Sequence, residues 1–133
     1  MPKTVVIIDD DSDDLDIMKE ALSQVDSSLL CISFVYPDEA IRLLSKELIL
    51  LPDFIFIDIN IPRISGDECL RQLRSIKEFD SIPIIMYSTS MPAVVAQTLQ
   101  LKGANFTFQK PFEFNGYATV LERIIYGTYH PHL

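Results

Sequence analysis

Five short apolar runs recur along the chain, and the segments between them carry apolar residues three or four positions apart. The runs are TVVIID (4–9), LLCISFV (29–35), DFIFID (53–58), IPIIMYS (82–88) and NFTFQ (105–109). The first, third and fourth runs lack an alternation of apolar and polar residues, which predicts strands covered on both faces. The spacing between the runs is that of helices with one buried face, so the pattern predicts five strands that alternate with five helices.

This alternation indicates how the elements are connected. Strands separated by helices form βαβ units, which place parallel strands in one sheet and helices on both of its faces. We therefore expect an α/β fold with a doubly wound parallel sheet. A chain of 133 residues is the size of one domain. We expect that domain to cover residues 1–127, followed by a short tail at 128–133 and no output domain.

Two of the expected helices have recognisable ends. Ser12 is in the position of an N-cap for the first helix, and Asp13 and Asp14 would then lie in its first turn, where negative charge is favourable. A later helix is expected to begin at Pro92 and to end at Gly103, because proline favours a helix start and glycine a helix end.

Polar side chains follow four of the five apolar runs, at the point where each strand ends. They are Asp9, Asp10 and Asp11 after the first run, Asp58 at the end of the third, Ser88, Thr89 and Ser90 at the end of the fourth, and Lys110 and Pro111 after the fifth. Each of them alone is an ordinary loop or surface residue. Because the carboxyl ends of parallel strands share one edge of a sheet, where the ligands of such folds bind, we expect the four groups to meet in one site.

Three carboxylates in one site require a compensating charge. If Asp9, Asp10 and Asp58 lie close together, two like charges about 4 Å apart repel by about 4 kcal/mol at an effective dielectric constant near 20. Magnesium suits such a cluster, since it prefers oxygen ligands from one or two carboxylates, water and phosphate. With the ammonium group of Lys110 and the hydroxyl group of Ser88, the site suits phosphoryl transfer to a carboxylate oxygen.

Composition narrows the class of partner. The chain carries 19 acidic and 11 basic residues, a net charge of −8 that disfavours direct binding to nucleic acid or to an anionic membrane surface. Cys31 and Cys69 lack CxxC spacing, so we interpret them as buried thiols of a reducing compartment. No apolar stretch approaches the roughly 20 residues that cross a bilayer, and the start of the chain does not resemble a signal peptide. We expect a cytoplasmic protein without a membrane partner.

Over residues 4–126 the chain resembles a receiver domain of the response regulators of bacterial two-component signalling, of the single-domain chemotaxis-regulator type. The matching motifs are VVIIDDD, FIFIDINIPRISG, IPIIMYSTS and GANFTFQKPF. Together and in this order they are highly specific for that family. The resemblance implies a flavodoxin-like (βα)5 fold of three α/β/α layers with strand order 2-1-3-4-5, and a signalling function rather than an enzymatic one.

The resemblance also assigns roles to the acidic residues. Asp58 would be the phosphoacceptor. Asp10 would ligate Mg²⁺ directly and Asp9 through water, while Asn60 would contribute its backbone carbonyl group; Mn²⁺ could replace Mg²⁺. Asp11 is interpreted as a helix-start residue and not as a ligand.

Further roles fall on the loops around these carboxylates. Ser88 would be the switch hydroxyl, and Lys110 would pair with the acceptor carboxylate or with the phosphoryl group. The peptide bond before Pro111 is often cis in the family, an isomer that only proline makes accessible at low cost. Pro62 and Gly66 would shape the loop that follows the third strand.

The chain departs from the family pattern at two positions. Thr107 stands three residues before the lysine, where the family usually has the Tyr or Phe of an aromatic switch. The neighbours Phe106 and Phe108 should both point to the opposite face of the strand. Thr89 follows Ser88 where the family often has Ala or Gly, and we expect its bulk to slow the access of water and small phosphodonors.

The partners implied by the resemblance are proteins. The phosphodonor would be a sensor histidine kinase or a histidine phosphotransfer protein, and the output would be contact with an unknown downstream protein. Ala93, Ala96, Thr107 and Val120 are the candidates for the docking surface. The chain would be a monomer or a weak phosphorylation-dependent dimer.

Four other interpretations compete with that of a terminal switch. An intermediate carrier in a phosphorelay would use the same residues. A haloacid-dehalogenase-type phosphatase needs a second Asp two residues after the first, where this chain has Asn60. A flavodoxin-like cofactor carrier needs a phosphate-binding loop after the first strand, where three aspartates would repel a phosphate. A receiver that folds but is never phosphorylated would not need the complete set of site residues, which are Asp9, Asp10, Asp58, Ser88 and Lys110.

Overall fold

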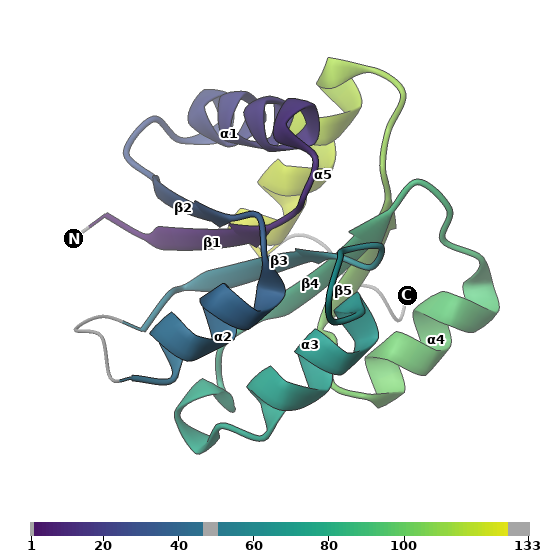
Figure 1. Ribbon diagram of the computed structural model, residues 1–133. Coiled ribbons are helices and arrows are strands. Elements are labelled where there is room, and N and C mark those ends of the chain that lie inside the picture. The colour runs from purple at the N-terminus through teal and green to yellow at the C-terminus, as the bar shows by residue number, and fades with distance from the viewer. Residues whose placement is uncertain (1, 47–50, 128–133) are drawn as a thin grey trace.

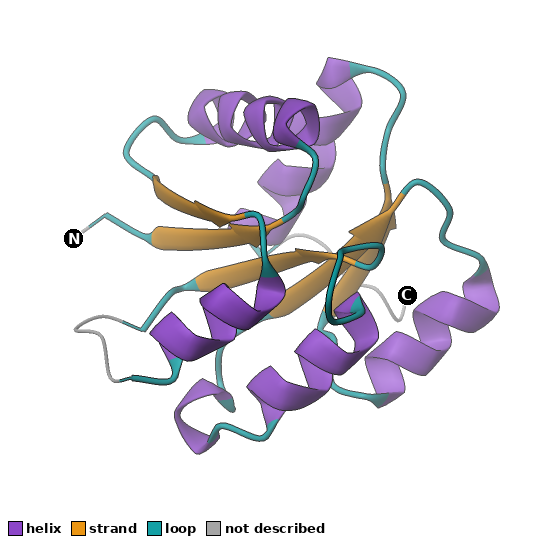
Figure 2. Cartoon of the chain, viewed as in Figure 1, coloured by secondary structure: helices purple, strands orange, loops and turns teal. Residues whose placement is uncertain are grey.

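Five parallel strands form a single sheet in the order β2-β1-β3-β4-β5, as predicted (Figures 1 and 2). The computed structural model describes residues 2–46 and 51–127. The strands are β1 (Thr4–Ile8), β2 (Leu30–Phe34), β3 (Phe54–Asp58), β4 (Ile84–Ser88) and β5 (Phe106–Gln109). Each begins within two residues of the start of its apolar run, which identifies the runs as the source of the strand pattern.

The helices cover both faces of the sheet (Figure 1). They are α1 (Ser12–Val25), α2 (Pro37–Leu44), α3 (Gly66–Arg74), α4 (Ala93–Leu101) and α5 (Phe114–Ile125), with a short 3-10 helix, η1 (Lys77–Phe79), after α3. Helices α1 and α5 lie on one face, and α2, α3 and α4 lie on the other. The predicted three-layer α/β/α architecture is therefore confirmed.

Two apolar clusters, one on each face, hold the layers together. Along β1 the side chains alternate, so that Val5 and Ile7 join the cluster under α1 and α5, while Val6 and Ile8 join the cluster under α2, α3 and α4. All four side chains are buried, and each contributes about 1.5–3 kcal/mol through removal from water. This two-sided burial explains why the central strands lack polar alternation.

The helix ends differ from the prediction at one position. The N-cap of α1 is Asp11, not Ser12: its carboxylate accepts hydrogen bonds from the backbone N–H groups of Asp13 and Asp14. Asp11 therefore has the expected helix-start role, and Ser12 is the first helical residue. At the end of α4, Gly103 has a φ of 116°, a conformation that strongly favours glycine.

Three sequence expectations concern the tail, membrane-spanning helices and the peptide bond before Pro111. The predicted tail at 128–133 lies outside the described residues. Within residues 2–46 and 51–127, no helix has both the length and the apolar character needed to span a membrane. Among these residues no peptide bond is cis, so the bond before Pro111, which is often cis in the family, is trans here.

Candidate functional site

The carboxyl edge of the sheet brings together the polar groups that follow the strands. Asp9 comes directly after β1, Asp58 is the last residue of β3, Ser88 is the last residue of β4, and Lys110 comes directly after β5. The Lys110 N–H group donates to the Ser88 carbonyl oxygen at 2.7 Å, which holds the ends of β5 and β4 together. Residues from four distant segments thus meet at one edge, as the spacing predicted.

Three carboxylates form a candidate metal site. One oxygen from each of Asp9, Asp10 and Asp58 lies within 4.8 Å of the other two. The side chains of Asp9 and Asp58 are buried, whereas Asp10 is exposed at the rim, where an ion can enter. An all-oxygen donor set with one open side fits Mg²⁺, which binds few protein ligands and retains several waters.

Asp9 is held by two hydrogen bonds inside the fold. The backbone N–H group of Asp11 donates to one carboxylate oxygen at 3.0 Å, and the hydroxyl group of Tyr87 donates to the other at 2.7 Å. Burial nevertheless raises the pKa of Asp9 to about 6, and the nearby charge of Asp58 adds to the rise. Without a bound cation, the fold therefore carries the charge of Asp9 at a cost.

Asp58 is positioned by the loop that follows it. The backbone N–H group of Asn60 donates to an Asp58 carboxylate oxygen at 3.0 Å. The loop returns to the end of β3 at Gly66, whose N–H group donates to the Ile59 carbonyl oxygen at 2.9 Å. A Cβ atom at Gly66 would lie 2.6 Å from the Ile59 Cα atom and 2.7 Å from the Asp58 carbonyl oxygen, so only glycine permits this approach. The predicted shaping role of Gly66 has a direct structural basis.

Pro62 lies within the same loop. Its carbonyl oxygen accepts a hydrogen bond from the Ile64 N–H group at 2.7 Å, which closes a tight turn. The next residue, Arg63, has a φ of 67°, which is uncommon for a residue with a side chain. Its guanidinium group pairs with Asp38 at 2.8 Å and lies over the ring of Tyr36. These contacts tie the loop after β3 to the start of α2.

Lys110 lies between three carboxylates. Its ammonium group donates to Asp14 at 2.6 Å and to Asp58 at 2.8 Å, and it lies 3.6 Å from Asp9. Burial alone would lower the pKa of Lys110, but the hydrogen bonds to Asp14 and Asp58 and the nearby carboxylate charges together raise it above its ordinary value. Lys110 is therefore a permanent positive charge in the site.

The Ser88 hydroxyl oxygen accepts two hydrogen bonds. The side-chain amide of Asn60 donates to it at 3.1 Å, and the backbone N–H group of Ser90 donates at 3.3 Å. Because both contacts use the oxygen as acceptor, the hydroxyl hydrogen is available to an acceptor in the site. Ser88 is thus oriented as a donor, which suits an anionic oxygen.

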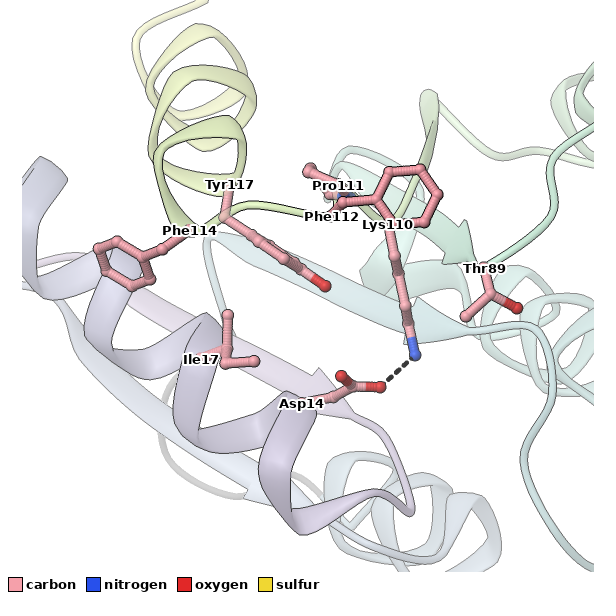
Figure 3. Close-up of a pocket in the computed structure, with 8 residues that line it drawn as sticks. All are labelled: Asp14, Ile17, Thr89, Lys110, Pro111, Phe112, Phe114 and Tyr117. Atoms are coloured by element: carbon pink, nitrogen blue, oxygen red, sulfur yellow. Dashed lines mark hydrogen bonds and ion pairs between the residues drawn. The ribbon is translucent and has the colours of Figure 1, made fainter.

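A cavity of about 320 Å³ opens beside this site (Figure 3). Its wall includes Thr89, Lys110 and Pro111 from the carboxyl edge. Its other residues come from α1, from the loop before α5, which contributes Phe112, and from the start of α5. Thr89 is exposed in this wall, at the position where its side chain was predicted to hinder small molecules.

The predicted docking surface is only partly present. Thr107 is 6% exposed, so its inclusion in a docking surface was wrong. Side chains alternate along β5, so Phe106 and Phe108 both point toward α1 and α5, which is the face opposite to Thr107, as predicted. Thr107, which lies between them in the sequence, points to the other face of the sheet and is buried there. Val120 packs against the core under α1 and α5. Ala93 on α4 is exposed.

The remaining candidate, Ala96, also lies on α4. It is half-buried, in the middle of the helix. The large exposed apolar side chains nearby are Val94 and Leu101. Of the four predicted residues, Ala93 therefore remains exposed, and Ala96 and Val120 remain partly accessible.

Three contacts at the site were not predicted from the sequence. They are the ion pair of Asp14 with Lys110, the hydrogen bond from Tyr87 to Asp9, and the hydrogen bond from the Asn60 side-chain amide to Ser88. Asp14 was interpreted only as a helix-start charge. One signal was available, since Asp14 precedes the buried Met18 by four positions and so lies on the same face of α1. The other contacts depend on the register between strands.

The fold and the site together define a class: a doubly wound α/β protein with acidic residues, a hydroxyl group and a lysine at the carboxyl edge of its sheet. Comparison with known sequences then gives the family. Residues 5–122 match the response regulator receiver domain, so the chain belongs to that family of two-component signal transduction.

Individual relatives agree with this assignment. The sensory transduction protein BceR of Halalkalibacterium halodurans is 28% identical over 122 residues, which are 91% of this chain and 49% of that protein. The chain spans a quarter or less of the length of three other curated relatives that it matches.

Solved structures agree in fold. The phosphorylated cyanobacterial phytochrome response regulator RcpA superposes with a TM-score of 0.85 at 20% identity, with all of both chains covered. The Mn²⁺-bound response regulator Rcp1 gives a TM-score of 0.80 at 20% identity, over 92% of this chain and 91% of that chain. These similarities confirm the predicted flavodoxin-like fold.

Proposed function

We propose that this receiver domain accepts a phosphoryl group on Asp58 and signals through contact with another protein. The observation that carries the proposal is the environment of Asp58. Its carboxylate shares a cluster of oxygens with Asp9 and Asp10 and lies 2.8 Å from the ammonium group of Lys110. A carboxylate nucleophile beside a cation site and a fixed positive charge suits phosphoryl transfer, where catalysis consists of positioning and charge neutralisation.

In the proposed reaction an Asp58 oxygen attacks phosphorus. The bond between phosphorus and the donor's histidine nitrogen breaks, and its electron pair remains on the imidazole. Lys110 donates hydrogen bonds to the anionic phosphoryl oxygens, because its ammonium group already lies at the attacking carboxylate. The Ser88 hydroxyl group donates another, since its oxygen is held by Asn60 and its hydrogen is available.

The acidic cluster would hold the metal ion that this reaction needs. Asp10 and Asp58 would be direct ligands, Asp9 would act through water, and Asn60 would add its backbone carbonyl oxygen. When bound, Mg²⁺ supplies positive charge that neutralises the carboxylates and the phosphoryl oxygens. Mn²⁺ shares the preference for carboxylate oxygens, and the neighbour Rcp1 binds it; we propose that it can substitute here.

The proposed partners follow from this chemistry. The donor is a sensor histidine kinase or a histidine phosphotransfer protein of the cytoplasm, and the target is a downstream protein. A phosphorelay carrier would use the same first step and differ only in passing the group to a second histidine. A dehalogenase-type phosphatase is disfavoured, because the amide of Asn60 cannot take the place of the acid/base aspartate two residues after the nucleophile.

The test uses acetyl phosphate as the donor and intact mass as the readout. Wild-type protein should gain one phosphoryl group with Mg²⁺ and none with EDTA, and Asp58→Asn should gain none. Asp53→Asn is the matched control, since Asp53 lies just before β3 at its other end and is exposed. Equal labelling of wild type and Asp58→Asn would overturn the proposal.

A further inference from the structure

The shortest contact of the Lys110 ammonium group is with Asp14, a residue of α1 outside the acidic cluster. The two side chains meet at 2.6 Å at the edge of the cavity, where Lys110 extends toward Asp14 (Figure 3). Lys110 is 7% exposed and Asp14 is 22% exposed, so the pair is largely shielded from solvent. The attraction between the two charges is stronger than in a surface ion pair, because water and salt screen it less.

This contact takes up part of the hydrogen-bonding capacity of the lysine. An ammonium group has three protons, and Lys110 donates to Asp14 and to Asp58 while lying 3.6 Å from Asp9. A phosphoryl group on Asp58 would bring further anionic oxygens to the same ammonium group. Asp14 would then compete with those oxygens for Lys110, and its own charge would oppose their approach.

The position of Asp14 is fixed by its helix. Its backbone N–H group donates to the carboxylate of the N-cap, Asp11. The next residue, Leu15, is buried in the cluster shared by α1 and α5. Moving Asp14 away from Lys110 would therefore require a new side-chain rotamer against a fixed backbone or a shift of the whole first turn.

We propose that Asp14 is a positioning residue that draws the Lys110 ammonium group toward α1 and so restrains the formation and the lifetime of the phosphorylated state. The proposal rests on the proposed function, since it concerns the same lysine. Removal of the Asp14 charge frees Lys110 for the phosphoryl oxygens. Anionic groups then bind better at Asp58, whereas a cation gains nothing, because one nearby negative charge is lost.

The test compares Asp14→Asn with Asp13→Asn. Both variants remove one carboxylate from the first turn of α1, but Asp13 is exposed. Acetyl phosphate donates its phosphoryl group to Asp58 as the bond from phosphorus to the acetate oxygen breaks and acetate leaves with the electron pair. We expect Asp14→Asn to hydrolyse its phosphoaspartate about tenfold more slowly than wild type, equivalent to about 1.4 kcal/mol, and Asp13→Asn to match wild type.

Two further measurements separate positioning from a structural role. Beryllofluoride, a phosphoryl mimic, should bind more tightly to Asp14→Asn in saturating Mg²⁺, while the affinity for Mg²⁺ alone is unchanged or lower. A structural defect would weaken both. Asp14→Glu retains the charge and should keep wild-type hydrolysis, which provides a second variant if Asp14→Asn unfolds.

The outcomes are distinguishable. Equal hydrolysis by Asp14→Asn and wild type would overturn the role of Asp14 while leaving Asp58 as the acceptor. Parallel loss of beryllofluoride and Mg²⁺ binding in Asp14→Asn would also overturn it, as would slow hydrolysis by both Asp14→Glu and Asp13→Asn. Absence of labelling in wild-type protein would overturn the proposed function, and this inference with it.

Discussion

Neutralising Asp9 should stabilise the metal-free protein at neutral pH. The side chain is buried among like charges, and burial raises its pKa from 3.8 to about 6. A rise of roughly two units corresponds to about 3 kcal/mol. We take about 1–3 kcal/mol, because water at the rim reduces the cost of the buried charge. In the variant Asp9→Asn the amide oxygen can still accept from Asp11, while the NH₂ group would meet the Tyr87 hydroxyl oxygen as a donor and so reverse that hydrogen bond.

The sign of the effect follows from linkage. The pKa of Asp9 is higher in the folded than in the unfolded state, so its contribution to stability is full below pH 3.8 and is lost as the pH rises through about 6. The Asp9→Asn variant has no ionisable group at this position, so it does not lose this stability as the pH rises. The difference in unfolding free energy between the variant and wild type should therefore be small at pH 4 and should grow to about 1–3 kcal/mol at pH 7.5.

Urea unfolding in EDTA, followed by far-UV circular dichroism at both pH values, measures this difference. Asp16→Asn is the control, because Asp16 lies exposed on α1 and its replacement should change stability by no more than about 0.5 kcal/mol. Addition of Mg²⁺ should stabilise wild type more than the variant. A variant less stable than wild type at pH 7.5, or a difference independent of pH, would refute the argument.

Three other substitutions probe the site. Gly66→Ala should destabilise the fold by about 1–3 kcal/mol in thermal unfolding, because its Cβ atom would lie 2.6 Å from the Ile59 Cα atom; unchanged stability would contradict the close approach. Tyr87→Phe removes the donor to Asp9 and should weaken Mg²⁺ binding about tenfold, as measured by calorimetry. Equal Mg²⁺ affinity of the variant and wild type would contradict this expectation. Thr89→Ala should speed hydrolysis of the phosphoaspartate, since Thr89 lines the cavity; an equal rate would refute its hindrance.

The parts that sequence could predict are those encoded locally or by simple geometry. Uninterrupted apolar runs in β1, β3 and β4 predicted central strands, because two-sided burial leaves no polar positions. The rule that parallel strands end at one edge then brought Asp58 and Lys110 together, although 52 positions separate them.

The parts that sequence missed depend on side-chain direction across elements. Asp14 looked like a helix-start charge, and only the packing of α1 against the sheet turns its carboxylate toward Lys110. Thr107 was a candidate for the docking surface, yet the register of β5 buries it. The choice between Asp11 and Ser12 as N-cap needed the backbone conformation, since both residue types are good caps.

The most direct test of the central claim is a crystal structure of the protein with Mn²⁺ and beryllofluoride. We expect beryllofluoride on an Asp58 carboxylate oxygen, an anomalous manganese signal between Asp10 and Asp58, and the Lys110 ammonium group within hydrogen-bonding distance of a fluorine. Beryllofluoride on another side chain, or manganese bound away from this cluster, would contradict the account.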